Sequence, residues 1–144
     1  FDSFEGLSDF TIEDKTKLVL LKEEENLKNH FMADFEKVKK KLSSYEFVKI
    51  FKGWIPDVFN DANIQDNQFA FVHIDVDLFE PTYDSIKYFF PKLSSGGVLI
   101  CDDYGTETFP GATLAIEKFI DSIDEKEIFS KTTGPAGGII LVKK

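Results

Sequence analysis

The stretch FAFVHIDVD, residues 69–77, is a short apolar run that ends abruptly in two carboxylates. A second run, GVLICDDY at residues 97–104, ends in the same way. Both are bounded by turn residues and rich in β-branched and aromatic side chains, which is typical of buried strands. Residues 82–93 between them carry apolar side chains at helical spacing. A strand, a helix and a second strand form a right-handed parallel crossover, which brings both acidic ends to one edge of a sheet.

The carboxylates at these strand ends would crowd together where open α/β sheets bind ligands. Like charges at close range repel one another unless one protonates or a cation lies between them. A hard divalent cation held by Asp75, Asp102 and Asp103 resolves the repulsion, because such cations prefer oxygen ligands. The alternative is that these side chains cap loops. For Asp77, a cap of the loop or of the following helix near Thr82 is the alternative to a place at the cation.

Composition limits the classes of protein that this chain can represent. With 144 residues, 42% hydrophobic residues and sixteen phenylalanines, residues 1–144 are expected to form one globular domain. The net charge of −9 argues against a nucleic-acid partner, because a phosphate backbone would be repelled. The lone Cys101 excludes an internal disulfide, and no apolar run is long enough to suggest a membrane partner. Cytoplasm is the expected compartment.

The rest of the chain fits an α/β sheet that is parallel except at one edge. Residues 27–42 follow helical spacing and are interpreted as a packing helix, and residues 47–51 are expected to form a strand. Thr11 and Asp14 form a candidate capping box for a further helix, carrying Leu18, Leu20 and Leu21. A helix after Phe109 is followed by a glycine-rich hairpin with strands at 127–131 and 138–142. His73 is interpreted as a hydrogen-bonded core histidine.

Four short motifs occur in a fixed order: FDSFEGL at 1–7, KGWIPD at 52–57, HIDVDLFEPT at 73–82 and DDYG at 102–105. Together they resemble the macrocin O-methyltransferase (TylF-type) family. Its members are class I methyltransferases that use S-adenosylmethionine and Mg²⁺ to methylate sugar hydroxyls of glycosylated natural products. The resemblance therefore implies a Rossmann-like sheet, a metal-dependent O-methyltransferase and a small hydroxylated acceptor.

The resemblance also implies a set of cofactor-binding residues. Asp2, followed by Ser3, would receive the ribose of S-adenosylmethionine, because a carboxylate accepts two hydroxyl hydrogen bonds. Gly53 and Trp54 would lie near the adenine. From the residues alone, Gly53 permits a close backbone approach and Trp54 offers a ring for stacking, with a plain turn anchored by tryptophan as the alternative.

By the same resemblance, three aspartates bind the metal and one of them is catalytic. Asp75, Asp102 and Asp103 match the metal ligands of the family, and Asp75 also holds the position of its general base. Tyr104 would line the acceptor pocket. Coordination of the acceptor hydroxyl to the metal would lower its pKa, so that Asp75 takes its proton.

One departure from the family concerns the start of the chain. Phe1 and Asp2 match the end of the second strand of the family, whereas its first strand and glycine-rich loop precede that position. The domain is therefore expected to be incomplete at its N-terminus, with unpaired strand edges that favour self-association. For the isolated 144-residue chain we expect weak cofactor binding and negligible activity.

Two alternatives to this function remain on the residues alone. The Asp75-Val76-Asp77 sequence is also the Asp-x-Asp signature with which glycosyltransferases hold manganese and a nucleotide-sugar. That class does not predict the Asp102-Asp103 pair at the next strand end. The other alternative is a non-catalytic fragment with a role in assembly or none.

Overall fold

The computed structural model describes residues 1–15, 24–61, 64–65, 67–134 and 137–144. Within them a four-stranded sheet has the order β1-β2-β4-β3. Its strands are β1 Phe69–Ile74, β2 Leu93–Cys101, β3 Ile128–Thr133 and β4 Ile139–Lys143. β1 and β2 are parallel, and β4 runs antiparallel to both β2 and β3. The expected sheet, mostly parallel with one antiparallel strand near the C-terminus, is confirmed.

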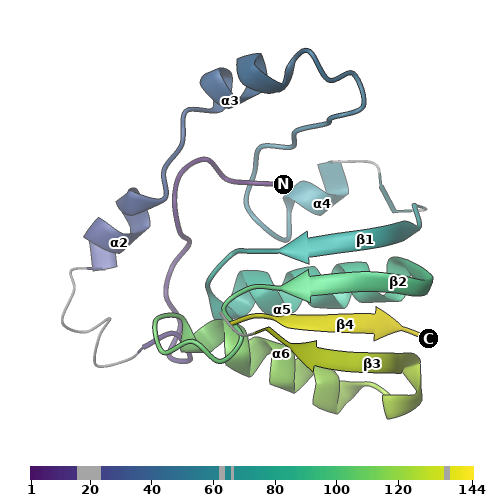
Figure 1. Ribbon diagram of the computed structural model, residues 1–144. Coiled ribbons are helices and arrows are strands. Elements are labelled where there is room, and N and C mark those ends of the chain that lie inside the picture. Colours follow the sequence, from purple (N-terminus) through teal and green to yellow (C-terminus); the bar gives the residue numbers. More distant parts are fainter. Residues whose placement is uncertain (16–23, 62–63, 66, 135–136) are drawn as a thin grey trace.

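Two long helices cover one face of this sheet (Figure 1). α5 (Phe79–Phe89), extended by a 3₁₀ turn at Phe90–Lys92, joins β1 to β2. α6 (Pro110–Ser122) joins β2 to β3 through a second 3₁₀ turn, Glu125–Glu127. The expected strand–helix–strand crossover is therefore present. Within the described ranges, no helix is long and apolar enough to cross a lipid bilayer.

The strand register explains the core beneath these helices. Leu99 pairs with Leu141 and Cys101 with Ile139, so the four side chains share one face of the sheet. All four have no exposed surface and pack with residues of α5 and α6 in the apolar core. Because burying such side chains is the main driving force of folding, this layer fixes the positions of the β1 and β2 ends.

The first half of the chain differs from its sequence interpretation. Instead of one helix over 27–42, the structure has α2 (Glu24–His30) and α3 (Phe35–Leu42), and a further short helix α4 (Val58–Asp61) follows. The break arises at Asp34, whose carboxylate accepts a hydrogen bond from the Lys37 backbone N–H at 3.1 Å and so begins a new helix. The leucines expected to form a helix after Asp14 lie outside the described residues.

The strand expected at residues 47–51 is absent from the described structure. Phe47 is 84% exposed, and regular pairing in this region is limited to an isolated parallel bridge between Asp2 and Lys52. A β-rich segment becomes a strand only where a neighbour supplies hydrogen-bond partners, and here that contact spans one residue on each side. A short run of apolar, β-favouring residues was therefore a misleading signal.

Asp14 caps the start of α5 and lies close against the start of α6. Its buried carboxylate accepts hydrogen bonds from the Phe79 backbone N–H at 2.8 Å and from the backbone N–H and hydroxyl of Thr11 at 2.9 and 2.8 Å. A side chain on Gly111, at the start of α6, would place its Cβ 1.8 Å from Asp14 Oδ1. Asp14 thus caps α5. The alternative that Asp77 caps this helix is wrong, because the N-cap residue is Leu78 and the Phe79 N–H bonds to Asp14, whereas a cap of the loop by Asp77 stays a prediction.

Candidate active site

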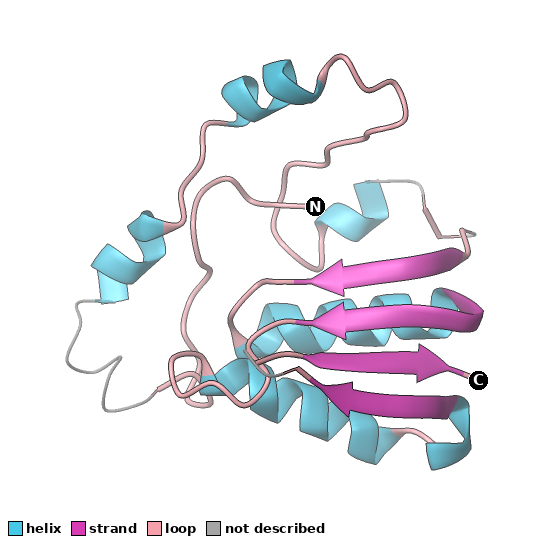
Figure 2. Cartoon of the chain, viewed as in Figure 1, coloured by secondary structure: helices cyan, strands magenta, loops and turns pink. Residues whose placement is uncertain are grey.

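β1 and β2 end at the same edge of the sheet (Figure 2). Three carboxylates lie close together at this edge. Asp75 and Asp77 follow β1, Asp103 follows β2, and one carboxylate oxygen of each lies within 4.8 Å of the other two. The two strand ends are joined by a hydrogen bond from the Asp102 N–H to the Ile74 carbonyl at 2.9 Å. The juxtaposition of acidic side chains from two neighbouring strands, expected from the sequence, is therefore present.

The backbone at this edge is unusual at two of the three aspartates. Asp77 and Asp103 have φ angles of 63° and 60°, in the left-handed region that aspartate tolerates better than most residues. The turn after β1 is also tight, because the Leu78 N–H bonds to the Val76 carbonyl at 2.6 Å. These sharp turns allow residues from two loops to present their carboxylates at one place.

The cluster is electrostatically unfavourable without a cation. Burial, followed by the charges of Asp103 and Asp75, raises the pKa of Asp77 to about 7. Burial, followed by the charges of Asp75 and Asp102, also raises the pKa of Asp103. Within the described ranges, no ion pair to a lysine or histidine neutralises any of the three clustered carboxylates. An all-oxygen donor set of this charge fits a hard divalent cation.

Asp102 is not part of this three-residue group. Its Oδ2 lies 3.9 Å from His73 Nε2, whereas the left-handed turn at the next residue directs Asp103 to the cluster. The structure thus gathers Asp77 with Asp75 and Asp103, and the ligand role of Asp102 stays a prediction. The interpretation of His73 as a core histidine is wrong, because 47% of its side chain is exposed.

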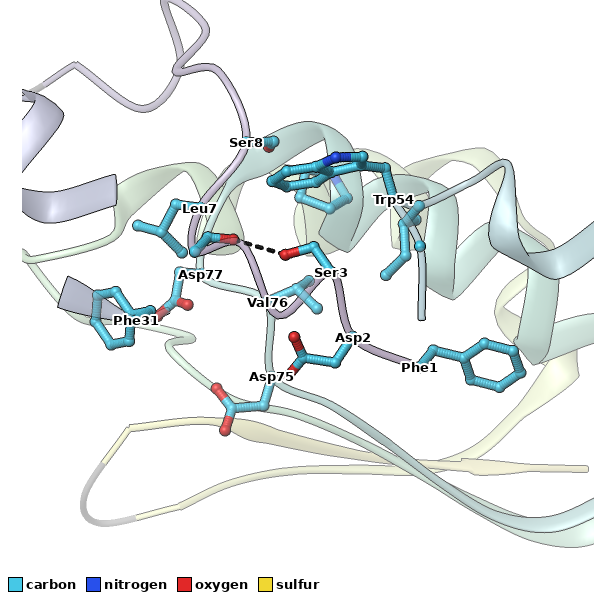
Figure 3. Close-up of a pocket in the computed structure, with 14 residues that line it drawn as sticks. Phe1, Asp2, Ser3, Leu7, Ser8, Phe31, Trp54, Asp75, Val76 and Asp77 are labelled. Carbon is cyan, nitrogen blue, oxygen red and sulfur yellow. Dashed lines mark hydrogen bonds between the residues drawn. The ribbon is translucent and has the colours of Figure 1, made fainter. Parts of the chain in front are cut away.

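A cavity of about 280 Å³ adjoins the carboxylates (Figure 3). The four residues proposed from the sequence to bind the cofactor, Asp2, Ser3, Gly53 and Trp54, all line it together with Asp75 and Asp77. Residues that the sequence interpretation missed, Leu7, Ser8 and Phe31, line it as well. Segments more than seventy residues apart in the sequence therefore form one site.

The first loop of the chain is rigidly held beside this cavity. The Asp2 carbonyl accepts a hydrogen bond from the Gly53 N–H at 3.0 Å, and Asp2 Oδ1 accepts one from the Phe4 N–H at 2.6 Å. Ser3 Oγ donates to the Gly6 carbonyl at 3.0 Å. Both side chains thus stabilise the loop itself, and their roles toward a cofactor stay predictions.

Tyr104 lies outside the residues that line this cavity. Its ring packs against the apolar core, and its backbone carbonyl accepts a hydrogen bond from the Gly138 N–H at 3.0 Å. Burial, followed by the neighbouring Glu117 charge, raises the pKa of the Tyr104 phenol. The acceptor-binding role of Tyr104 therefore stays a prediction that the cavity geometry does not support.

Among the residues of this site, Phe31 is the one for which the sequence interpretation was least accurate. Its helical spacing indicated a packing role, yet 44% of its surface is exposed and its ring lines the cavity. Asp77 was also not assigned to the cluster from the sequence, because its place there depends on a left-handed turn, with φ 63° at Asp77 itself.

The order of strands and helices, with acidic side chains at the ends of two parallel strands, defines a methyltransferase-like α/β fold of class I. Two solved structures share it. "Structure of the O-methyltransferase NovP" matches with a TM-score of 0.77 and 24% identity, over 99% of this chain and 58% of that one. "Crystal Structure of CalS11, Calicheamicin Methyltransferase" matches with a TM-score of 0.71 and 20% identity, over 98% and 58%. At these identities the likeness establishes the fold.

Residues 1–130 match the family described as Macrocin-O-methyltransferase (TylF), and the chain belongs to this family. It is 29% identical over 117 residues to demethyldecarbamoylnovobiocin O-methyltransferase of Streptomyces niveus, over 72% of this chain and 40% of that protein. It is 30% identical over 92 residues to 8-demethyl-8-(2,3-dimethoxy-alpha-L-rhamnosyl)-tetracenomycin-C 4'-O-methyltransferase of Streptomyces olivaceus, over 60% and 34%. The chain thus spans 40% or less of the length of these curated relatives. The family resemblance noted in the sequence is confirmed.

Proposed function

We propose that this chain belongs to an S-adenosylmethionine-dependent O-methyltransferase and carries its divalent-cation site. The enzyme would methylate a hydroxyl of a glycosylated small molecule. The family and the printed activities of the two relatives support the reaction type. The observation that carries the proposal is the carboxylate cluster of Asp75, Asp77 and Asp103. Two of its members, Asp75 and Asp77, line a cavity that Asp2 and Trp54 also line.

The donor would lie on the side of the cavity formed by the first loop and residues 53–55. S-Adenosylmethionine supplies an electrophilic methyl group on a sulfonium. The Asp2 carboxylate would accept hydrogen bonds from ribose hydroxyls, and adenine would stack on Trp54, which lines the cavity and is 40% exposed. These contacts would hold sulfur, methyl carbon and acceptor oxygen in line, and such positioning accounts for much of the rate in a transfer of this kind.

The acceptor hydroxyl would lie at the carboxylates. A divalent cation held by Asp75, Asp77 and Asp103 would supply positive charge that lowers the pKa of a neighbouring hydroxyl. Asp75 follows β1 directly and is exposed, so its carboxylate is accessible to accept the hydroxyl proton. A pair of neighbouring hydroxyls on the acceptor fits this arrangement better than one, because two oxygens can approach the cation together.

The cation site is tested by titrating the chain with Mn²⁺ and following the free ion by electron paramagnetic resonance. Asp75→Asn, Asp77→Asn and Asp103→Asn should each weaken binding at least tenfold, since each removes one charged ligand (a tenfold loss is about 1.4 kcal/mol). Asp121→Asn, an exposed position on α6, is the matched control and should bind as the parent does. If the three cluster variants bound Mn²⁺ as tightly as the Asp121→Asn control, the proposed cation site would be refuted.

Asp102→Asn distinguishes the two ligand sets. If the cluster defined by the structure holds the ion alone, this variant should lose much less affinity than Asp103→Asn. Equal losses in the two variants would restore the ligand set of Asp75, Asp102 and Asp103 inferred from the sequence.

The donor side is tested by calorimetry with S-adenosylhomocysteine and, separately, with uridine diphosphate, each in the presence of Mg²⁺. If the chain belongs to a methyltransferase, S-adenosylhomocysteine should bind with measurable heat, even if its affinity is weak. Binding of the diphosphate alone would instead favour the Asp-x-Asp glycosyltransferase class. Robust methyl transfer by the isolated 144-residue chain would contradict the expectation that it is inactive alone.

A further inference from the structure

Phe31 is an exposed aromatic residue at a polar site. It follows α2 directly, 44% of its surface is accessible, and it lines the same cavity as Asp75 and Asp77. Its ring meets the Phe109 ring edge-on, with centroids 6.2 Å apart. Phe109 precedes α6 in the loop that follows β2 and contains Asp103, so the aromatic pair joins the first half of the chain to that loop.

The backbone around Phe31 is fixed by contacts with the first loop. The Leu7 N–H donates to the Lys28 carbonyl, and the Ala33 N–H donates to the Phe4 carbonyl, both at 3.3 Å. Glu5 and Met32 form an antiparallel bridge. Gly6 is required for this approach, because a Cβ there would lie 1.8 Å from the Lys28 carbonyl oxygen. The position of Phe31 is therefore set by hydrogen bonds on both of its sides.

Phe31 and the residues assigned to the donor lie on opposite sides of the cavity. In Figure 3 its ring lies on the Asp77 side, whereas Trp54 and Phe1 lie across the cavity. On the proposed function, the donor occupies the Trp54 side, and the acceptor enters between the carboxylates and Phe31. An apolar ring beside the hydroxyl-binding carboxylates suits an acceptor with both a polar and a planar apolar part.

We propose that Phe31, supported by Phe109, is a specificity-determining residue that receives a planar apolar group attached to the sugar. The site then favours aryl glycosides over glycosides with a small aglycone. The inference rests on the proposed function, because it assumes that the sugar hydroxyls lie at Asp75 and Asp77. An offset or edge-on contact between two aromatic rings strengthens binding by about three- to tenfold beyond area burial.

The experiment compares phenyl and methyl α-L-rhamnopyranoside, which share the same neighbouring hydroxyls, by calorimetry with the full chain in saturating Mg²⁺. The parent chain should bind the phenyl glycoside about three- to tenfold more tightly. Phe31→Ala should bring the ratio of the two dissociation constants close to one while leaving the methyl glycoside unaffected. Phe31→Leu, which keeps apolar bulk without a ring, should give an intermediate ratio.

Phe47→Ala is the matched control, because Phe47 is 84% exposed and does not line the cavity. It should leave both affinities unchanged. If Phe31→Ala still preferred the phenyl glycoside, the specificity role of Phe31 would be overturned, but the proposed hydroxyl site would not. Equal losses for both glycosides would also overturn it, since Phe31 would then bind the sugar. Failure of both glycosides to bind the parent chain would refute the hydroxyl site itself, and with it this inference.

Discussion

Replacing Asp77 by asparagine should stabilise the metal-free chain at about pH 8, although it removes a proposed functional group. Asparagine is neutral and nearly the same shape, and it tolerates the left-handed backbone found at this position, φ 63°. Its amide can also donate a hydrogen bond to Asp103, as a protonated Asp77 would. The substitution therefore removes one charge from a repulsive cluster and changes little else.

The magnitude follows from the pKa of Asp77, which is raised to about 7, mainly by burial and then by Asp103 and Asp75. An aspartate that titrates near 4 when unfolded and near 7 when folded costs about 4 kcal/mol once ionised in the folded chain. Because the carboxylate is partly solvated, solvent screening reduces this to about 2 kcal/mol. For a chain of this size, that is a rise of about 6 °C in Tm.

The sign of the pH dependence is equally specific. The folded state binds the Asp77 proton more tightly than the unfolded state, so this group makes stability fall as the pH rises from about 4 to 7. Thermal unfolding followed by circular dichroism should therefore show a Tm advantage for Asp77→Asn at about pH 8 that largely disappears near pH 4.5. Adding Mg²⁺ at the higher pH should stabilise the parent chain more than the variant.

The control is again Asp121→Asn on the outer surface of α6, which should change Tm little at either pH. If Asp77→Asn were no more stable than the parent at the higher pH, the account of a strained, cation-seeking cluster would be refuted. An advantage of equal size at both pH values would show that packing, rather than ionisation, is responsible.

Three further substitutions test the scaffold and the donor side. Asp14→Ala leaves the buried Phe79 N–H without its partner, so the free energy of unfolding in urea should fall by about 2–3 kcal/mol, and a loss below about 1 kcal/mol would contradict the cap. Gly6→Ala strains a residue at φ 86° and displaces the Lys28 carbonyl, so Tm should drop, whereas an unchanged Tm would show that the loop adapts freely. Trp54→Ala should weaken S-adenosylhomocysteine binding about tenfold in calorimetry, and undiminished affinity would remove Trp54 from the adenine site.

The sheet and its acidic edge were predictable because their signals are local. An apolar run that ends in carboxylates specifies both a strand and the chemistry at its end, and β2 follows that pattern. β1 has the expected strand and acidic end, but the expected burial is wrong, because only Ile74 of its six residues is buried. Asp75 and Asp103 were recognisable for this reason. Which neighbour completes the cluster was not, because the choice between Asp77 and Asp102 depends on a left-handed turn that leaves little trace in the sequence.

The errors arose where tertiary contacts decide the structure. Helical spacing across residues 27–42 concealed the Asp34 cap and the exposed Phe31 between two helices. The apolar, β-favouring residues at 47–51 indicated a strand, but a strand also needs a neighbouring strand to pair with. The Thr11–Asp14 pair does interact, as a capping box would, yet the same carboxylate caps a helix that begins 65 residues later.

That distant cap couples the two halves of the molecule mechanically. Through Asp14, the leading segment that carries Asp2 is tied to the first turn of α5, which directly follows the acidic turn at Asp77. On the proposed function, a nucleoside that binds against Asp2 would therefore also restrain the turn that carries Asp77. Such a linkage would make the two ligands bind cooperatively, with each raising the affinity for the other by the same factor.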